Sequence, residues 1–250
     1  MKKLKFLGVM AMAALLFTSC LDGGSNEISG PTYGVVKLSS KSYKNLLHEL
    51  TGLTVYHPNL EALQSGDCLA CYRKINQDDA VNQSATEYLT ASELTYQKID
   101  QRPLMSVLKD TTVFDDKEMT VLDVGIVGYV EGMLFIQSAH PNAASDQTVE
   151  VSLSYNHGQE VETVNGEDVY NLFLRSKKLT DGKNTSGNVI FETAFRMEEF
   201  FSYACNVEKG KGKEVVKFRF NYIKEFDKDS INATWGTSKV IDYQIPTQTN

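Results

Sequence analysis

The feature that most constrains the fold is a series of short segments in which apolar and polar residues alternate between turn residues. Every second residue from Val149 to Tyr155 is apolar, which is the period-two pattern of a half-buried strand. Asn165-Gly166 is a strong signal for a two-residue type I′ hairpin. Short strands at this spacing are typical of small barrels and sandwiches. The sequence therefore predicts a mainly β chain.

The alternating segments form two groups on either side of a polar break at residues 115–118 (DDKE). The first group begins at Tyr33 and predicts a small β-barrel or sandwich over residues 33–118. The second group predicts mostly antiparallel strands, which fits an antiparallel β-sandwich over residues 119–250. Residues 194–203 fit either a helix or a strand. Residues 209–213 (KGKGK) have the composition of a charged hairpin tip.

The N-terminal residues have the pattern of a secretory signal. Lys2, Lys3 and Lys5 precede an uncharged apolar run from Phe6 to Phe17. At about 1.5 Å of rise per residue this run reaches about 18 Å, which is short of a bilayer core of about 30 Å. It therefore predicts a signal segment rather than a permanent membrane span.

A cysteine stands at the expected cleavage point. Leu16 to Cys20 (LFTSC) is similar to the lipobox of bacterial lipoproteins, in which the cysteine carries the lipid. We expect residues 1–19 to form the signal peptide, Cys20 to be lipidated, and residues 20–32 to form a flexible tether. The alternative is an ordinary signal peptide with a chance cysteine. Lipidation implies a location at the outer membrane, facing either the periplasm or the cell surface.

The charge of the chain excludes one class of partner. The formal net charge is −7 at pH 7, and it becomes more negative when the three lysines of the signal segment are removed. No basic stripe remains, so we expect no nucleic-acid partner. The expected partners are the membrane, through Cys20, and a protein or glycan ligand. The oligomeric state is left open.

Three features together resemble the NigD-like family of bacterial lipoproteins. They are a lipobox ending in Cys20-Leu21-Asp22, a Ser65-Gly66-Asp67 turn before a strand that ends at Asp78-Asp79, and the segment Asn171 to Arg175 (NLFLR). The resemblance implies an N-terminal OB-like domain, a C-terminal β-sandwich domain and no established catalytic role. The chain departs from the family in its tether, which lacks a run of aspartates, and at Ser176-Lys177, where a His-Asn pair is often found.

Cys68 and Cys71 form a CxxC pair, which occurs in zinc sites and redox disulfides. The chain has no second CxxC and no HxxxH, and residues 68–75 read as a strand. An offset of three in a strand places two side chains on opposite faces. We expect two small core residues here. A disulfide from either thiol to Cys205, or a redox or metal role, is the alternative.

The remaining motifs give no catalytic constellation. His48, His57, His140 and His157 lie in separate segments, and we expect each to be a solvated side chain. The sequence lacks the nucleophile turn of hydrolases, a P-loop and a dinucleotide-binding glycine motif. We therefore expect no catalytic residue, no metal and no cofactor.

These observations predict a non-enzymatic envelope lipoprotein that acts in binding or assembly at the outer membrane. The alternative function is that of a glycan-binding accessory lipoprotein of a polysaccharide uptake system. An exposed coplanar pair of aromatic rings would favour the glycan alternative, because sugar rings stack on such platforms.

Overall fold

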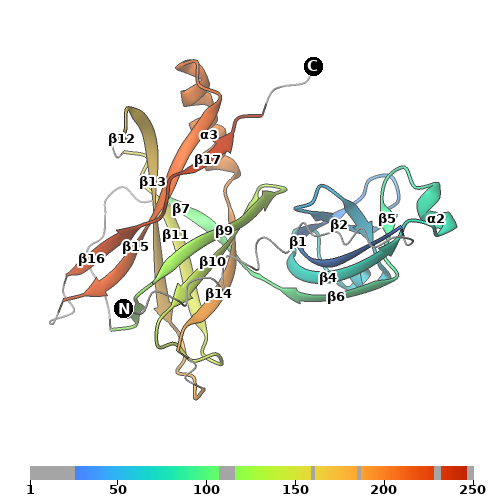
Figure 1. Cartoon of the computed structure of the whole chain (residues 1–250), viewed down its shortest axis with the longest axis horizontal. Coiled ribbons are helices and arrows are strands. Elements are labelled where there is room, and N and C mark those ends of the chain that lie inside the picture. Colours follow the sequence, from blue (N-terminus) through green and yellow to red (C-terminus); the bar gives the residue numbers. More distant parts are fainter. Residues whose placement is uncertain (1–25, 107–115, 159–160, 185–186, 228–231, 247–250) are drawn as a thin grey trace, which may run out of the picture. The chain divides into compact units, whose positions relative to one another are not determined.

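The computed structural model describes residues 26–106, 116–158, 161–184, 187–227 and 232–246 (Figure 1). Most of these residues lie in strands, so the predicted mainly β class is confirmed. The chain divides into two units. The first contains the described residues up to Gln101 together with Val127–Met133, and the second contains Arg102–Ile126 and the residues from Leu134 onward.

The first unit is a six-stranded sheet with the order β5-β3-β2-β1-β4-β6. Its strands are β1 (Glu27–Leu38), β2 (Asn45–Glu49), β3 (Thr54–Tyr56), β4 (Cys68–Asn76), β5 (Leu89–Thr90) and β6 (Glu93–Lys98), and its helices are η2 (Pro58–Ala62) and α2 (Ala80–Gln83). Strands β5 and β6 lie at opposite edges of this order, yet only Ala91 and Ser92 separate them. The sheet must therefore curl into a barrel, with β5 parallel to β3 and β6 antiparallel to β4.

The barrel contains a closely packed apolar cluster. This cluster consists of Val36, Leu47, Leu60, Leu63, Leu69, Cys71 and Leu94. Strands β1 and β2 approach so closely at Gly34 that a Cβ atom there would lie 2.6 Å from the carbonyl oxygen of His48. Glycine at this position therefore permits the close pairing of the two strands.

Strand β1 begins earlier than the sequence predicts. Residues 27–32 were expected in the flexible tether, but they extend β1 from Glu27. They pair with β4 from Glu27↔Asn76 to Val35↔Cys68. Backbone hydrogen bonds to β4 along this register hold residues 27–32 in a strand, although these residues show little apolar alternation.

The second unit is built on an eleven-stranded sheet with the main order β16-β15-β13-β11-β7-β14-β10-β9. Its strands are β7 (Asp100–Ser106), β8 (Glu118–Met119), β9 (Asp123–Val130), β10 (Met133–His140), β11 (Val149–Tyr155), β12 (Glu162–Val164), β13 (Glu167–Lys178), β14 (Val189–Arg196), β15 (Val215–Phe226), β16 (Ala233–Thr237) and β17 (Ile241–Gln244). The pairs β11–β7 and β13–β15 are parallel, while β11–β13, β15–β16 and β15–β17 are antiparallel. The sheet curls, and this arrangement is consistent with the predicted β-sandwich.

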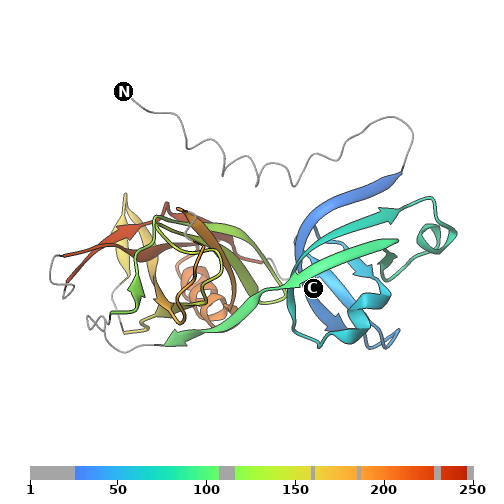
Figure 2. The ribbon, with the colours of Figure 1, turned by 90° about the horizontal axis from the view of Figure 1, so that it is seen from below.

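Helix α3 (Glu198–Gly210) packs on β15 within this unit (Figure 2). It resolves the ambiguous stretch 194–203, because β14 ends at Arg196 and the helix starts two residues later. The predicted charged hairpin tip at residues 209–213 is wrong. Lys209 and Gly210 end α3, and residues 211–213 belong to the connection between this helix and β15 rather than to a turn between two strands.

The second unit also starts earlier than the boundary predicted at residue 118. Strand β7 belongs to the second sheet because it pairs with β11, from Leu104↔Leu153 to Ser106↔Tyr155. The Asn165-Gly166 hairpin is confirmed, since β12 and β13 meet there with φ of 53° and 82° at the two turn residues. No helix among the described residues is long and apolar enough to cross a membrane.

Candidate functional site

The predicted lipidation residue, Cys20, lies outside the described residues. The other cysteines lie in the cores of the two units. Cys68, Cys71 and Cys205 are all buried, and none of them forms a disulfide. Burial raises the pKa of the Cys71 thiol to about 12, and the nearby Glu49 carboxylate adds to this effect. A thiol with such a pKa is a poor nucleophile and metal ligand at neutral pH.

The histidines differ in their surroundings. His48 Nδ1 lies 2.8 Å from the Glu131 carboxylate, and His57 Nδ1 accepts a hydrogen bond from the backbone N–H of Asn59 at the start of η2. His157 is exposed at the surface. His140 is fully buried, so the expectation of a solvated side chain is wrong for this residue. It lies in β10, whose alternation places it in the core.

A Ser–His arrangement exists around His140, but it is closed to substrates. His140 Nε2 lies 3.0 Å from the Ser138 hydroxyl and 3.5 Å from that of Ser176, and Nδ1 lies 3.1 Å from the carbonyl oxygen of Thr120. Ser138, His140 and Ser176 are all fully buried. The cluster therefore satisfies buried polar groups.

The most distinctive surface site lies at one end of the barrel of the first unit. We call it the Lys44 site and define it by Ser42, Tyr43, Lys44, Tyr56 and Tyr88. These residues come from the β1–β2 loop, the end of β3 and the residue before β5. In OB folds the β1–β2 and β4–β5 loops and the face of strands 2 and 3 bind ligands. The Lys44 site occupies this position.

Lys44 is held between two aromatic rings. Its Nζ lies 4.1 Å from the ring centroid of Tyr56 and 5.3 Å from that of Tyr88. It also donates a hydrogen bond to the Tyr88 hydroxyl at 3.0 Å, and this bond raises the pKa of the Lys44 ammonium. The group is therefore a fixed positive charge with ring faces beside it. A hydrogen bond from Ser39 to Glu87 also joins the two loops.

The neighbouring residues carry features that packing does not explain. Tyr43 has φ of 55°, a conformation that is unfavourable for a bulky residue, and 79% of its surface is exposed. The hydroxyl of Ser42 is buried without a hydrogen-bond partner. Strained backbone and unsatisfied polar groups are common at functional sites. In this loop the strained backbone conformation is that of Tyr43, whose aromatic ring is exposed to solvent.

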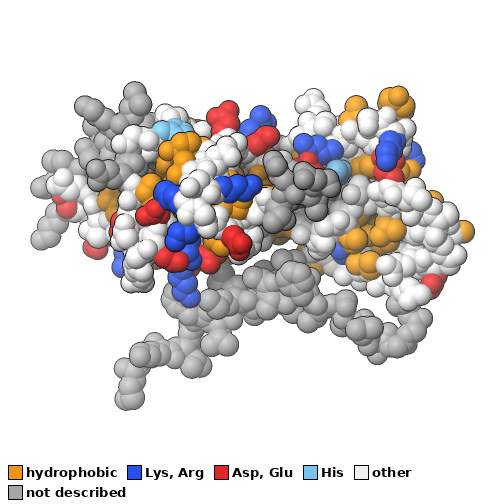
Figure 3. Space-filling view, turned by 90° about the horizontal axis from the view of Figure 1, so that it is seen from above, with side chains coloured by type: hydrophobic (Ala, Val, Ile, Leu, Met, Phe, Trp, Pro, Cys, Tyr) orange, Lys and Arg blue, Asp and Glu red, His pale blue; other side chains and the backbone are white. Residues whose placement is uncertain are grey.

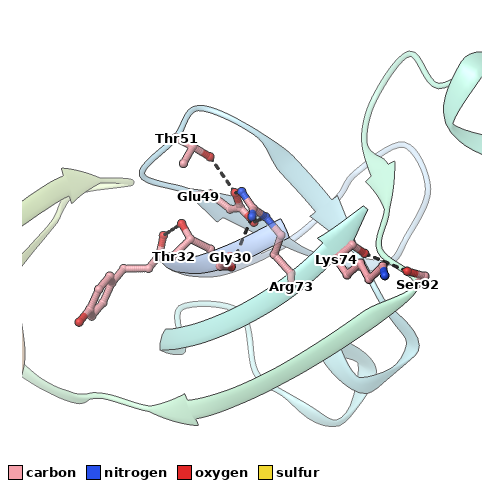
Figure 4. Close-up of polar contacts among 8 residues, drawn as sticks. Gly30, Thr32, Glu49, Thr51, Arg73, Lys74 and Ser92 are labelled. Carbon is pink, nitrogen blue, oxygen red and sulfur yellow. Dashed lines mark hydrogen bonds and ion pairs between the residues drawn. The ribbon is translucent and has the colours of Figure 1, made fainter. Parts of the chain in front are cut away.

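A second polar cluster lies inside the same barrel, towards the other end of β2 (Figure 4). Arg73 Nε and Nη2 lie 3.2 and 3.3 Å from the two carboxylate oxygens of Glu49. Arg73 also donates to the carbonyl oxygen of Gly30, and Thr51 donates to Glu49. The side chains of the ion pair are 5% and 0% exposed. This pair links β1, β2 and β4, and its burial indicates a structural role.

Two of the surface pockets in the described part of the second unit have charged residues in their lining. One, of about 200 Å³, is lined by carboxylates and lysines around Glu208. Glu208 accepts hydrogen bonds from Tyr170 and Lys211, and Lys217 pairs with Glu167. No group of three or more metal-binding side chains occurs within the described part of the chain. The other pocket, of about 100 Å³, lies at the start of α3.

The aromatic pairs of the second unit do not form an open flat platform. Phe201 and Tyr243 stack with centroids 3.9 Å apart, but Phe201 is buried. The half-buried rings of Phe173 and Trp235 meet edge to face at 89°. On the face drawn in Figure 3, hydrophobic side chains appear in patches among polar ones.

A family model described as the lipoprotein OB domain matches residues 24–97. The first unit is a lipoprotein OB domain. The match covers the first unit alone, and the expected resemblance to NigD-like lipoproteins is confirmed at the level of this domain. No curated protein matches the sequence.

Three solved structures resemble the OB domain together with the second unit. An uncharacterized protein from Parabacteroides merdae is 25% identical with a TM-score of 0.76, over 87% of this chain and 100% of that one. A predicted lipoprotein from Bacteroides fragilis is 12% identical with a TM-score of 0.55, over 88% and 100%. A NigD-like immunity protein from Bacteroides caccae is 10% identical with a TM-score of 0.48, over 88% and 98%.

No signal in the sequence pointed to the Lys44 site. Lys44, Tyr56 and Tyr88 are separated by up to 44 residues along the chain and meet only because β5 pairs with β3. If the OB fold is recognised, its usual ligand-binding loops include the two loops that form this site.

Proposed function

We propose that the protein is a non-enzymatic lipoprotein, held at the outer membrane through lipidated Cys20, that binds a protein of the envelope at the Lys44 site. The observation that carries the proposal is the exposed Tyr43 beside the fixed Lys44 charge. Tyrosine is enriched in protein interfaces and among the few residues that carry most of their binding energy. The position at the ligand end of an OB fold supports the same conclusion.

The absence of an accessible catalytic cluster among the described residues supports a binding role rather than an enzymatic one. The one Ser–His arrangement, around His140, is fully buried. The carboxylate-lined pocket holds its charges in ion pairs with lysines. A turnover that is lost on substitution of a single pocket residue would contradict this part of the proposal.

The test is site-specific cross-linking in cells. A photoreactive phenylalanine analogue replaces Tyr43 in one strain and Tyr72, which is 46% exposed on β4, in a matched control strain. We expect a discrete adduct from position 43, and we expect Lys44→Ala to reduce it in the same background. Identical adducts from both positions, or none from position 43, would contradict the proposal.

Glycan binding is the second candidate function, and the same exposed ring of Tyr43 favours it. The two other rings of the site are 54° from coplanar and have Lys44 between them, so they do not form the flat stacking platform that sugars prefer. Electrophoresis through gels that contain envelope or dietary polysaccharides decides between the candidates. Retardation that Tyr43→Ala abolishes would support glycan binding.

Which side of the outer membrane the protein faces is tested by protease treatment of intact cells, with a periplasmic protein as the leakage control. Loss of the chain from intact cells would place it on the cell surface. Survival until the outer membrane is permeabilised would place it in the periplasm. The side of the membrane that the protein faces determines which proteins or glycans can reach the Lys44 site.

A further inference from the structure

The small pocket of the second unit lies where three elements end. It is lined by Pro103, Leu104, Met105 and Ser106 of β7, by His157 after β11, and by Arg196, Glu199 and Phe200 at the junction of β14 and α3. Its volume is about 100 Å³. All of these residues belong to the second unit, so the pocket is independent of the Lys44 site.

Two opposite charges line this pocket without pairing. The Arg196 guanidinium and the Glu199 carboxylate make no ion pair or side-chain hydrogen bond, either with each other or with any residue that the structure describes. Both residues are exposed. Most other charged side chains around the second sheet are paired, such as Arg102 with Glu150 and Lys211 with Asp168.

The polar wall of the pocket is ordered by its neighbours. The ring of His157 meets Tyr155 edge to face at 4.7 Å and Tyr203 at 5.3 Å, measured between centroids. Helix α3 begins at Glu198 without a side-chain cap from Met197. The first N–H groups of a helix have no partner within it. Glu199 and Phe200 of this first turn line the pocket beside Arg196.

The opposite wall is apolar. Leu104, Met105 and Phe200 contribute aliphatic and aromatic surface to the same small volume. Met105 is 44% exposed, although methionine side chains usually pack in cores. An apolar group of a ligand would remove this surface from water, which favours binding.

We propose that this pocket binds a small zwitterion with an apolar tail, of the chemical class of a free α-amino acid. The carboxylate would pair with Arg196, the ammonium with Glu199, and the tail would contact Met105 and Leu104. A ligand with only a negative charge would meet the Glu199 carboxylate, and one with only a positive charge would meet Arg196. A zwitterion satisfies both charges at once.

The test compares three probes with the same branched tail: L-leucine, 4-methylpentanoate and 3-methylbutylamine. Each is titrated into the mature chain carrying Cys20→Ser, and binding is followed by saturation-transfer NMR and by thermal shift. We expect L-leucine to bind at least about tenfold more tightly than either singly charged probe, because each lacks one charge-assisted contact.

Glu199→Gln and Arg196→Gln should each weaken L-leucine binding by about tenfold or more. Glu198→Gln is the matched control, because Glu198 is an exposed acid in the same helical turn that does not line the pocket. No binding of L-leucine at millimolar concentration would overturn the proposal. Equally tight binding of 4-methylpentanoate or of 3-methylbutylamine would also overturn it.

Discussion

Three buried polar residues, in two clusters, show how single side chains are accommodated in this chain. His140 lies in the second unit and is fully buried, and the Arg73–Glu49 pair lies inside the barrel of the OB domain. Buried polar groups are costly unless they are hydrogen bonded. Both clusters meet that requirement with neighbours from other strands. The stability of each unit therefore depends on the hydrogen bonds of its buried polar cluster.

His140 should make the second unit less stable in mild acid. Burial lowers the pKa of this imidazole from 6.5 to about 4, although the hydrogen bond to the Thr120 carbonyl opposes the shift. The unfolded chain binds the proton more readily, so the contribution of neutral His140 is present above about pH 6.5. It is lost as the pH falls towards 4, and the total is on the order of 3 kcal/mol.

Urea unfolding at several pH values between 7.5 and 4 checks this expectation. The free energy of unfolding should fall more steeply with decreasing pH in the wild type than in His140→Gln, which has no imidazole to protonate. The exposed residue His157 provides the control variant, His157→Gln, which should follow the wild type. Parallel curves for wild type and His140→Gln would contradict the prediction.

Arg73→Met should destabilise the OB domain by about 3–5 kcal/mol, because it leaves the buried Glu49 carboxylate without its cation. The double variant Arg73→Met/Glu49→Leu should recover much of this loss, since it removes both charges from the interior. Urea unfolding of the four proteins in the double-mutant cycle gives the coupling energy. A single variant as stable as the wild type would show that the pair is not buried in solution.

At the scale of elements, the OB barrel depends on one close strand pairing. The β1–β2 register places Gly34 opposite Glu49, and the space beside its Cα is filled by the backbone of His48 and the side chain of Leu47. Backbone atoms cannot move aside as a flexible side chain can. The pairing of β1 with β2 therefore tolerates no side chain at this position.

Gly34→Ala should destabilise the OB domain by about 1–3 kcal/mol, because the new Cβ would lie 2.6 Å from a backbone oxygen and the strands must separate. Gly125→Ala in β9 is the control, since nothing lies within 4 Å of a Cβ at that position. Thermal unfolding compares the two variants. The prediction fails if Gly34→Ala unfolds at the same temperature as Gly125→Ala.

Element prediction from the sequence was accurate where the signal is local. The alternation in residues 149–155 and the Asn165-Gly166 turn both correspond to the observed strands and hairpin. It was wrong for residues 27–32, whose strand conformation comes from pairing with β4. The same holds for β7, whose assignment to the second sheet follows from its distant partner β11.

At the scale of the whole molecule, both units keep their cysteines inside their cores. Cys68 and Cys71 lie in the OB domain and Cys205 lies in helix α3 of the second unit. Burial raises the pKa of Cys71 to about 12 and raises that of Cys205. A buried, protonated thiol reacts slowly with disulfide reagents.

In the mature Cys20→Ser chain, the three remaining thiols should therefore be inert towards Ellman's reagent at pH 8 while the protein is folded. All three should react in concentrated urea. The release of thionitrobenzoate, followed by absorbance, measures both states. Rapid reaction of one thiol in the folded chain would show that the corresponding core opens readily.

Cys20→Ser should release the whole molecule from the membrane fraction, because the serine hydroxyl cannot receive the thioether-linked lipid. Several acyl chains are needed for stable anchoring, since each buried CH₂ contributes only about 0.8 kcal/mol. Fractionation of cells that express each form checks the expectation. A variant that remains with the membrane would disprove the lipobox interpretation.

The sequence by itself determined the features that a few neighbouring residues encode: the mainly β class, the Asn165-Gly166 hairpin and the burial of the CxxC pair in a strand. Only the tertiary structure decided which strands pair. That pairing closes the barrel through β5 and β6, buries His140 and brings Lys44 between Tyr56 and Tyr88. Alternation records which face of a strand is apolar, whereas the choice of a distant partner depends on the packing of the whole core.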